Sequence, residues 1–125
     1  MPGFAAPVGG LFAAPHGAIC AAVLPHATAI NVQALRARAP KSPALRRYDE
    51  VARLLTGHPN AVAEDAVDWM ARICRQLEIP PLGNYGVSQA DIPELVEKAA
   101  RASSMKGNPI VLTPAELRET IARAI

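Results

Sequence analysis

Two histidines stand on an apolar, alanine-rich background near the start of the sequence, and histidine is the commonest metal ligand among side chains. His16 and His26 each follow a proline in the stretch AAPHGAICAAVLPHATAIN, residues 13–31. Ten residues of continuous helix separate two side chains by about 15 Å along the axis and about 80° around it. Metal–nitrogen bonds are only about 2 Å long. The two histidines therefore do not chelate one metal together.

Taken singly, the histidines differ in their surroundings. His16 stands beside Gly17 at a helix start defined by a proline, which is an accessible position. A lone histidine is rarely a metal ligand, so the residue types alone favour a structural role for His16. His26 follows Pro25 within an apolar helical pattern, and we interpret it as a structural histidine that bonds a carbonyl group. His58, in GHPN, is predicted to lie in a surface turn.

Other patterns that carry chemistry are missing from the sequence. It has no Cys/His cluster at zinc spacing, no glycine-rich phosphate loop and no nucleophile elbow. Cys20 and Cys74 lie far apart within apolar helical patterns, so we expect free, buried thiols in a reducing cytoplasm. Glu64, Asp65 and Asp68 form an acidic run that is typical of the solvated face of a helix.

Length and composition indicate one globular domain of 125 residues, with 50% hydrophobic and 19% charged residues. A net charge of +2 with scattered arginines argues against a nucleic-acid partner. We expect no membrane partner, because no apolar run approaches the length that spans a bilayer. Prolines and glycines break the apolar N-terminus, which has no basic region, so no signal peptide is predicted and the expected location is cytoplasmic.

The fold class predicted is all-α, with about five to six helices. Aromatic residues make up only 4% of the chain, alanine and leucine are plentiful, and no alternating pattern is long enough for a strand. Pro7 should interrupt the first helix, and the segment RARAPKS, residues 36–42, should be a basic exposed loop. The helices are expected at residues 4–14, 15–35, 42–57 and 60–78, and after residues 91 and 113.

Local signals predict how these helices bend and begin. Pro25 removes one backbone donor from the second helix, so we expect a kink near residues 21–24. Asp91 and Glu94 should form a capping box at the start of the fifth helix. The sequence TPAE places Thr113 at the cap of the last helix, with Glu116 to close the box.

Longer motifs resemble those of one family. GGLFAAPHGAICAAVLPHATAIN, RRYDEVARLLTG and LEIPPLGNYGVSQADIPELVEKAARASSMKGNPIVLTPAELRETI follow one another across nearly the whole chain. In this order they resemble the iron-dependent (group III) alcohol dehydrogenases, in particular the branch that includes maleylacetate reductases. Full-length relatives have an α/β domain that binds NAD(P) and a C-terminal helical domain that holds the metal. The chain is similar to the second.

The resemblance also implies which residues bear on the metal site. The family's metal is held by one aspartate and three histidines, and the histidine of the PHG motif corresponds to His16 here. Pro2 stands where another histidine ligand would be, and Ala6 stands where many members carry a further histidine. The aspartate and the remaining histidine would precede Met1. His26 matches a position that is not a ligand.

The implied function is that of a metal-binding domain of an oxidoreductase that transfers hydride between NAD(P) and an alcohol or carbonyl substrate. Fe²⁺ or Zn²⁺ and NAD(P) are the cofactors of full-length relatives. Residues 1–125 are expected to form a single helical domain, truncated at its N-terminus and lacking the NAD(P)-binding domain. A separate N-terminal NAD(P)-binding half would then be its partner.

The resemblance leaves two hypotheses. The chain is either a fragment or split subunit of such an enzyme, inactive alone, or a non-catalytic helical remnant or interaction module. Without its partner domain, Phe4, Val8, Leu11 and Phe12 are expected to be exposed.

Overall fold

The computed structural model describes residues 4–125 of the chain, and within these residues it contains α-helices, short 3₁₀ helices and no strand. The predicted all-α class is confirmed. The α-helices are α1 (Ala5–Leu11), α2 (His16–Arg38), α3 (Pro43–Thr56), α4 (Ala63–Gln76), α5 (Ile92–Arg101) and α6 (Pro114–Ala124). The 3₁₀ helices are η1 (Leu82–Tyr85), η2 (Gln89–Asp91) and η3 (Ser103–Gly107).

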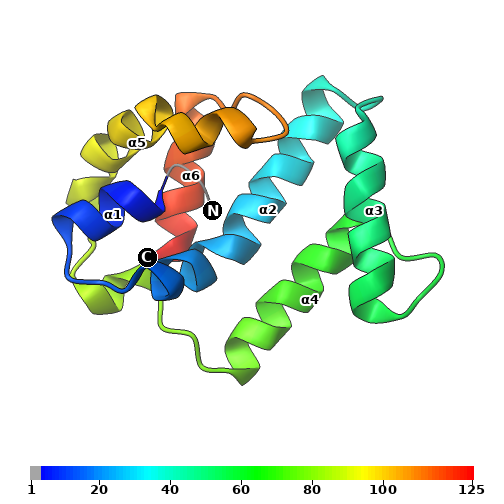
Figure 1. Cartoon of the computed structure of the whole chain (residues 1–125), viewed down its shortest axis with the longest axis horizontal. Helices are drawn as coiled ribbons and strands as arrows, with labels where there is room; N and C mark the ends of the chain where they lie inside the picture. Colours follow the sequence, from blue (N-terminus) through cyan, green and yellow to red (C-terminus); the bar gives the residue numbers. More distant parts are fainter. Residues whose placement is uncertain (1–3) are drawn as a thin grey trace.

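Helix α2 runs through the middle of the molecule and packs against the helices on both sides of it. In Figure 1, α1, α5 and α6 lie on one side of α2, and the α3–α4 hairpin lies on the other. The first half of α2 buries Ile19, Val23 and Ala27 in the larger core. The second half buries Val32 and Leu35 against α3 and α4. Because α2 is needed by both cores, it is apolar nearly all round.

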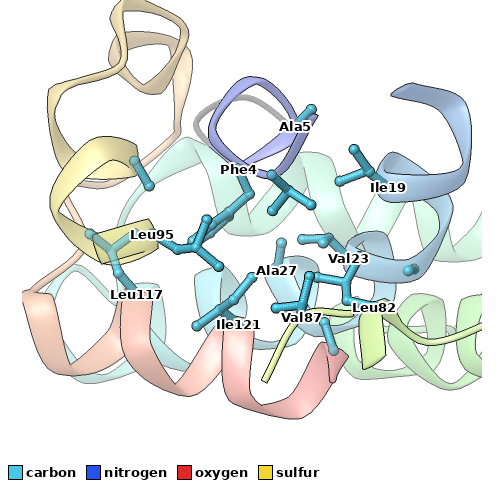
Figure 2. Close-up of a cluster of buried hydrophobic side chains, with 14 of the residues drawn as sticks. Phe4, Ala5, Ile19, Val23, Ala27, Leu82, Val87, Leu95, Leu117 and Ile121 are labelled. Carbon is cyan, nitrogen blue, oxygen red and sulfur yellow. The ribbon is translucent and has the colours of Figure 1, made fainter. Parts of the chain in front are cut away.

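The larger core contains residues from α1, α2, α5, α6 and the segment between α4 and α5 (Figure 2). Phe4 at 2% exposure and Val8 at 0% are part of it, so the expectation that they are exposed is wrong. Phe12 is also partly buried, whereas Leu11 is 41% exposed as expected. The reason is that α1 folds back onto α2 and α5 and turns its apolar side inward.

Pro7 does not interrupt α1, which differs from the prediction. It lies in the first turn of a helix that begins at Ala5, and first-turn N–H groups have no partner within a helix. The ring therefore costs no backbone hydrogen bond there. Pro25 is different, because it lies in the interior of α2 and leaves the carbonyl group of Ala21 without its helical donor. The helix nevertheless continues through it, and Cys74 donates to that carbonyl at 3.7 Å.

Helix α2 extends three residues beyond the predicted end, so residues 36–38 are helical and not loop. Arg36 and Arg38 are exposed, as expected, but both are held by carboxylates of other helices. Arg36 makes two hydrogen bonds to Glu64 on α4, of 2.5 and 2.7 Å. Arg38 bonds Glu116 of α6 at 2.6 Å and the carbonyl oxygen of Val111 at 2.7 Å. These contacts stabilise the last turn of α2.

Helix α2 is long and apolar enough to cross a membrane, judged by length and composition, with a mean hydropathy of 1.4. The expectation that no apolar run approaches the length of a membrane span is therefore wrong. In this fold 61% of its most apolar window is buried against other helices. A core helix of a helical domain has the same features, so the helix is weak evidence for a membrane span.

Helices α3 and α4 form a hairpin that is tied together near its turn. Asp49 on α3 accepts a hydrogen bond of 2.8 Å from the backbone N–H of Ala63, the first residue of α4. Arg53 donates from Nε to the carbonyl oxygen of Ala61 at 3.2 Å. Gly57 ends α3 with φ 75°, a left-handed conformation that glycine adopts without strain. His58 follows it and is exposed, which confirms the predicted surface turn.

The predicted caps are right for α6 and wrong for α5. Thr113 accepts from the N–H of Glu116 at 3.2 Å, and Glu116 accepts from the N–H of Thr113 at 2.8 Å. At α5, Asp91 instead accepts from the N–H and hydroxyl of Ser88, at 2.8 and 3.0 Å. The chain enters this helix through η2, so the capping interaction lies one turn earlier than predicted and Glu94 is not needed for it.

The loop after η3 is fastened to α2 by a pair of amide side chains. Asn31 is 6% exposed, and its Nδ2 donates to Oδ1 of Asn108 at 3.1 Å. Asn108 returns a bond of 2.8 Å to Oδ1 of Asn31 and donates to the carbonyl oxygen of Ile110 at 2.7 Å. Asn31 also lies 3.4 Å from the hydroxyl of Tyr48. The buried amide is thus satisfied only when the loop is in place.

Candidate metal centre

His16 is the first residue of α2, and its side chain is exposed. Pro15 precedes it in an extended conformation, with φ −63° and ψ 140°, and the helix begins directly afterwards. Two residues in the following turns, Ile19 and Val23, are buried in the larger core at 0% exposure. The imidazole is therefore accessible, at the exposed start of a helix whose next turns are buried.

Cys20 lies one helical turn after His16, and its Sγ is 3.5 Å from Nε2 of the imidazole. This is a hydrogen-bond distance for sulfur, and the direction of the bond depends on the histidine tautomer. Cys20 is half-buried and free, as is Cys74, so the prediction of free thiols holds but neither is fully buried. Sequence reasoning missed this pair, although the spacing HGAIC, with the two residues four apart, was a signal for it.

His26 lies on the same continuous helix as His16 and is half-buried. It lines a hollow of about 210 Å³ together with Cys74, Arg75 and Arg123, among other residues. Burial, and then the positive charge of Arg123, lower the pKa of His26 below its ordinary value of 6.5. Among residues 4–125 no hydrogen bond of its ring is recorded, so the predicted bond to a carbonyl is not seen there. His26 is best described as a neutral histidine packed beside arginines.

The donors at His16 do not by themselves fit a catalytic iron centre. In the part of the chain that the structure describes, no three His, Cys, Asp or Glu side chains come together. Ala6 lies on α1 with a methyl side chain that cannot bind a metal. Pro2 lies outside the described residues. Catalytic metal sites have three protein ligands as a rule, so the residues at hand supply too few.

Another hollow, of about 560 Å³, lies on the α3–α4 hairpin and is separate from His16. Asp65 and Asp68 line it beside Trp69, and His58 and Arg72 lie at the same hollow. The two carboxylates and Glu64 are exposed, which confirms the prediction of a solvated helix face. Glu64 is paired with Arg36, and this bond lowers its pKa.

Two solved structures share this fold closely. 1,3-Propanediol oxidoreductase matches with a TM-score of 0.82 at 26% identity, and an iron-containing alcohol dehydrogenase from Thermococcus thioreducens with a TM-score of 0.72 at 27% identity. Each match covers 98% of this chain, and the chain spans 31% of the length of each structure. A comparison with curated proteins finds no match. The fold is therefore that of a helical part of alcohol dehydrogenase-type oxidoreductases.

The family itself follows from the sequence of nearly the whole chain. A family model described as the Fe-containing alcohol dehydrogenase family, C-terminal, matches residues 3–125. The chain belongs to this family, as the PHG and KGNP motifs indicated. Its narrower place in the maleylacetate reductase-like branch stays a prediction.

Proposed function

We propose that this chain is the metal-side helical domain of an alcohol dehydrogenase-type oxidoreductase and contributes His16 as one metal ligand. The observation that carries the proposal is an accessible imidazole at the start of a buried helix, in a chain whose residues 3–125 match the C-terminal part of the iron-containing family. The remaining ligands and the NAD(P) site would come from polypeptide outside residues 4–125.

Elementary chemistry defines what each component of such an assembly would contribute. A divalent metal polarises the oxygen of an alcohol or carbonyl group, and a nicotinamide carries the hydride. What this chain supplies is an exposed imidazole at the start of α2 and the apolar helices that hold it. Because one imidazole is too little to hold a catalytic metal, we propose that the chain alone has no dehydrogenase activity. The proposed location is the cytoplasm, with neither nucleic acid nor a membrane as a partner.

The proposed partner is a separate NAD(P)-binding half, and the test is to reconstitute the two. The chain would be co-expressed with a matching NAD(P)-binding polypeptide, and complex formation followed by size-exclusion chromatography. Carbonyl-dependent oxidation of NADH or NADPH would then be measured with small alcohols and their carbonyl forms. His16→Ala should abolish activity while leaving the complex intact. His58→Ala is the matched control, because His58 is also exposed but lies on the α3–α4 turn.

The alternative is a helical module without catalytic function. It is favoured by the absence of a three-ligand cluster within residues 4–125. Lack of any complex and of any activity in the reconstitution would contradict the enzyme proposal and leave this alternative. Activity that survives His16→Ala unchanged would contradict the role given to His16.

A further inference from the structure

The first turns of α2 place two metal-binding side chains next to each other. His16 and Cys20 are four residues apart, so they lie on the same face of the helix. Sγ of Cys20 and Nε2 of His16 are 3.5 Å apart. Cys20 is half-buried and packs against the larger core. His16 is exposed, which leaves one side of the pair open to solvent.

The distance between the two atoms suits a tetrahedral metal. Zinc binds thiolate sulfur at about 2.3 Å and imidazole nitrogen at about 2.0–2.1 Å. At a tetrahedral angle these bond lengths place the two ligand atoms about 3.6 Å apart, and at an octahedral right angle about 3.1 Å apart. The observed 3.5 Å lies close to the tetrahedral value. The spacing on the helix therefore brings both donors within the range of a shared zinc ion. Binding would require the side chains to rotate until both donor atoms point at the metal.

The donor types point to the same metal class. Thiolate and imidazole together select zinc and similar borderline cations, whereas magnesium, calcium and manganese prefer oxygen ligands. We propose that His16 and Cys20 form a two-ligand site for Zn²⁺, with water completing the coordination. This site needs no residue from outside the chain, and it differs from the donor set that an iron centre of the family would use. It rests on the proposed function only in sharing His16 as an accessible ligand.

Binding has a defined proton balance. The Cys20 thiol loses its proton to solvent as the sulfur–zinc bond forms, and His16 binds in its neutral form. With two protein ligands the site is weaker than three-ligand zinc sites. The competing explanation for the 3.5 Å distance is a simple hydrogen bond between thiol and imidazole, which would bind no metal.

Titration of the full, reduced chain with Co²⁺ separates the two explanations. Cobalt takes the place of zinc, and a cobalt–thiolate bond gives a charge-transfer absorption in the near ultraviolet. We expect this absorption to saturate at one equivalent and to disappear when Zn²⁺ is added. Absence of the band from the folded wild-type chain would overturn the proposal. Circular dichroism confirms that each protein used is helical.

Matched variants identify the ligands. Cys20→Ser should remove the charge-transfer band, and Cys74→Ser should keep it, since Cys74 is the other cysteine of the chain and donates to a carbonyl on α2. His16→Ala should weaken Co²⁺ binding at least about tenfold, which corresponds to about 1.4 kcal/mol. His58→Ala should leave it unchanged. A band that survives Cys20→Ser, or that is lost with Cys74→Ser alone, would show that the site is elsewhere.

The two proposals fail in different experiments. If the isolated chain binds no Co²⁺ but the reconstituted enzyme depends on His16, the zinc pair is wrong and the proposed function stands. If the isolated chain gives the cobalt–thiolate band but no NAD(P)-binding half reconstitutes activity, the zinc pair stands and the oxidoreductase proposal is wrong.

Discussion

The thiol of Cys74 on α4 donates a hydrogen bond of 3.7 Å to the carbonyl oxygen of Ala21 on α2. Ala21 lies four residues before Pro25, so its carbonyl is the one that the proline leaves without a helical donor. A side chain 53 positions further along the chain thus compensates for a defect in the central helix. The compensation is partial, because a thiol is a weak donor.

This relationship predicts coupling between Cys74 and Pro25. Cys74→Ala should lower the free energy of unfolding by about 1 kcal/mol, since it leaves the Ala21 carbonyl without a partner. In a Pro25→Ala background the helix provides its own N–H, so the same cysteine change should cost less. A double-mutant cycle from urea unfolding measures the difference. Equal costs in both backgrounds would show that Cys74 contributes packing alone.

Burial of α1 predicts that Phe4 contributes strongly to stability. Phe4→Ala should lower the free energy of unfolding by about 3 kcal/mol or more, because it removes a large side chain that is 2% exposed. Leu11→Ala, at 41% exposure at the end of α1, is the matched comparison and should cost much less. Thermal or urea unfolding followed by circular dichroism measures both. Similar small costs would mean that α1 does not pack in solution as it does here.

The amide pair predicts a specific cost for losing the loop contact. Asn108→Ala leaves the buried amide of Asn31 without its main partner, and a buried unsatisfied polar group costs about 1–3 kcal/mol. Asn84→Ala removes an exposed amide instead and should change stability little. Unfolding free energies provide the comparison. Hydrogen exchange in residues 105–112 should also rise in Asn108→Ala, and unchanged protection there would contradict the fastening role.

The lowered pKa of His26 predicts that the free energy of unfolding depends on pH. Its pKa is lowered in the folded state, by burial and by Arg123, so the unfolded chain takes up the proton first. Stability from this residue is therefore present above its ordinary pKa of 6.5 and is lost as pH falls below that value. The slope from one such group is at most about 1.4 kcal/mol per pH unit, and is smaller for a half-buried ring.

Replacing the histidine tests this directly. His26→Gln should flatten the fall in unfolding free energy between about pH 7 and 5. The pKa values of Glu64 and Glu116 are lowered in the folded state. The stability that these carboxylates contribute is therefore present above pH 4.5 and is lost as pH falls below that value. They therefore do not mask the effect of His26. A wild-type profile that is level from pH 7 to 5, or a variant profile as steep as the wild type, would contradict the assignment.

Local patterns in the sequence were enough to predict the helical class, most of the helix bounds and the cap at Thr113. These features depend on residues within a few positions of one another, so helical spacing and capping residues report them. The family was recognisable for a related reason, because the motifs around His16 and Asn108 are contiguous. Because His16 and His26 lie in one continuous helical pattern, helix geometry also showed that they are too far apart to bind one metal.

Features that depend on distant residues were missed or mispredicted. Phe4 and Val8 were expected at the surface, but the return of α1 onto α2 and α5 buries them. Residues 36–38 were expected to be loop, but they continue α2, and Arg36 and Arg38 pair with Glu64 and Glu116 of other helices. The capping interaction before α5 joins Ser88 and Asp91 and not Asp91 and Glu94 as expected, because the chain enters α5 through η2.

The sequence by itself determined the fold class and the family, because these depend on residue type and local spacing, and the resemblance to the family made His16 the candidate ligand. Tertiary structure decided which apolar residues are buried, which carboxylate each arginine meets, and that Cys74 serves the carbonyl freed by Pro25. The physical reason is that burial and hydrogen-bond pairing depend on which helices pack together. Helix packing in turn depends on the summed free energy of many contacts across the chain.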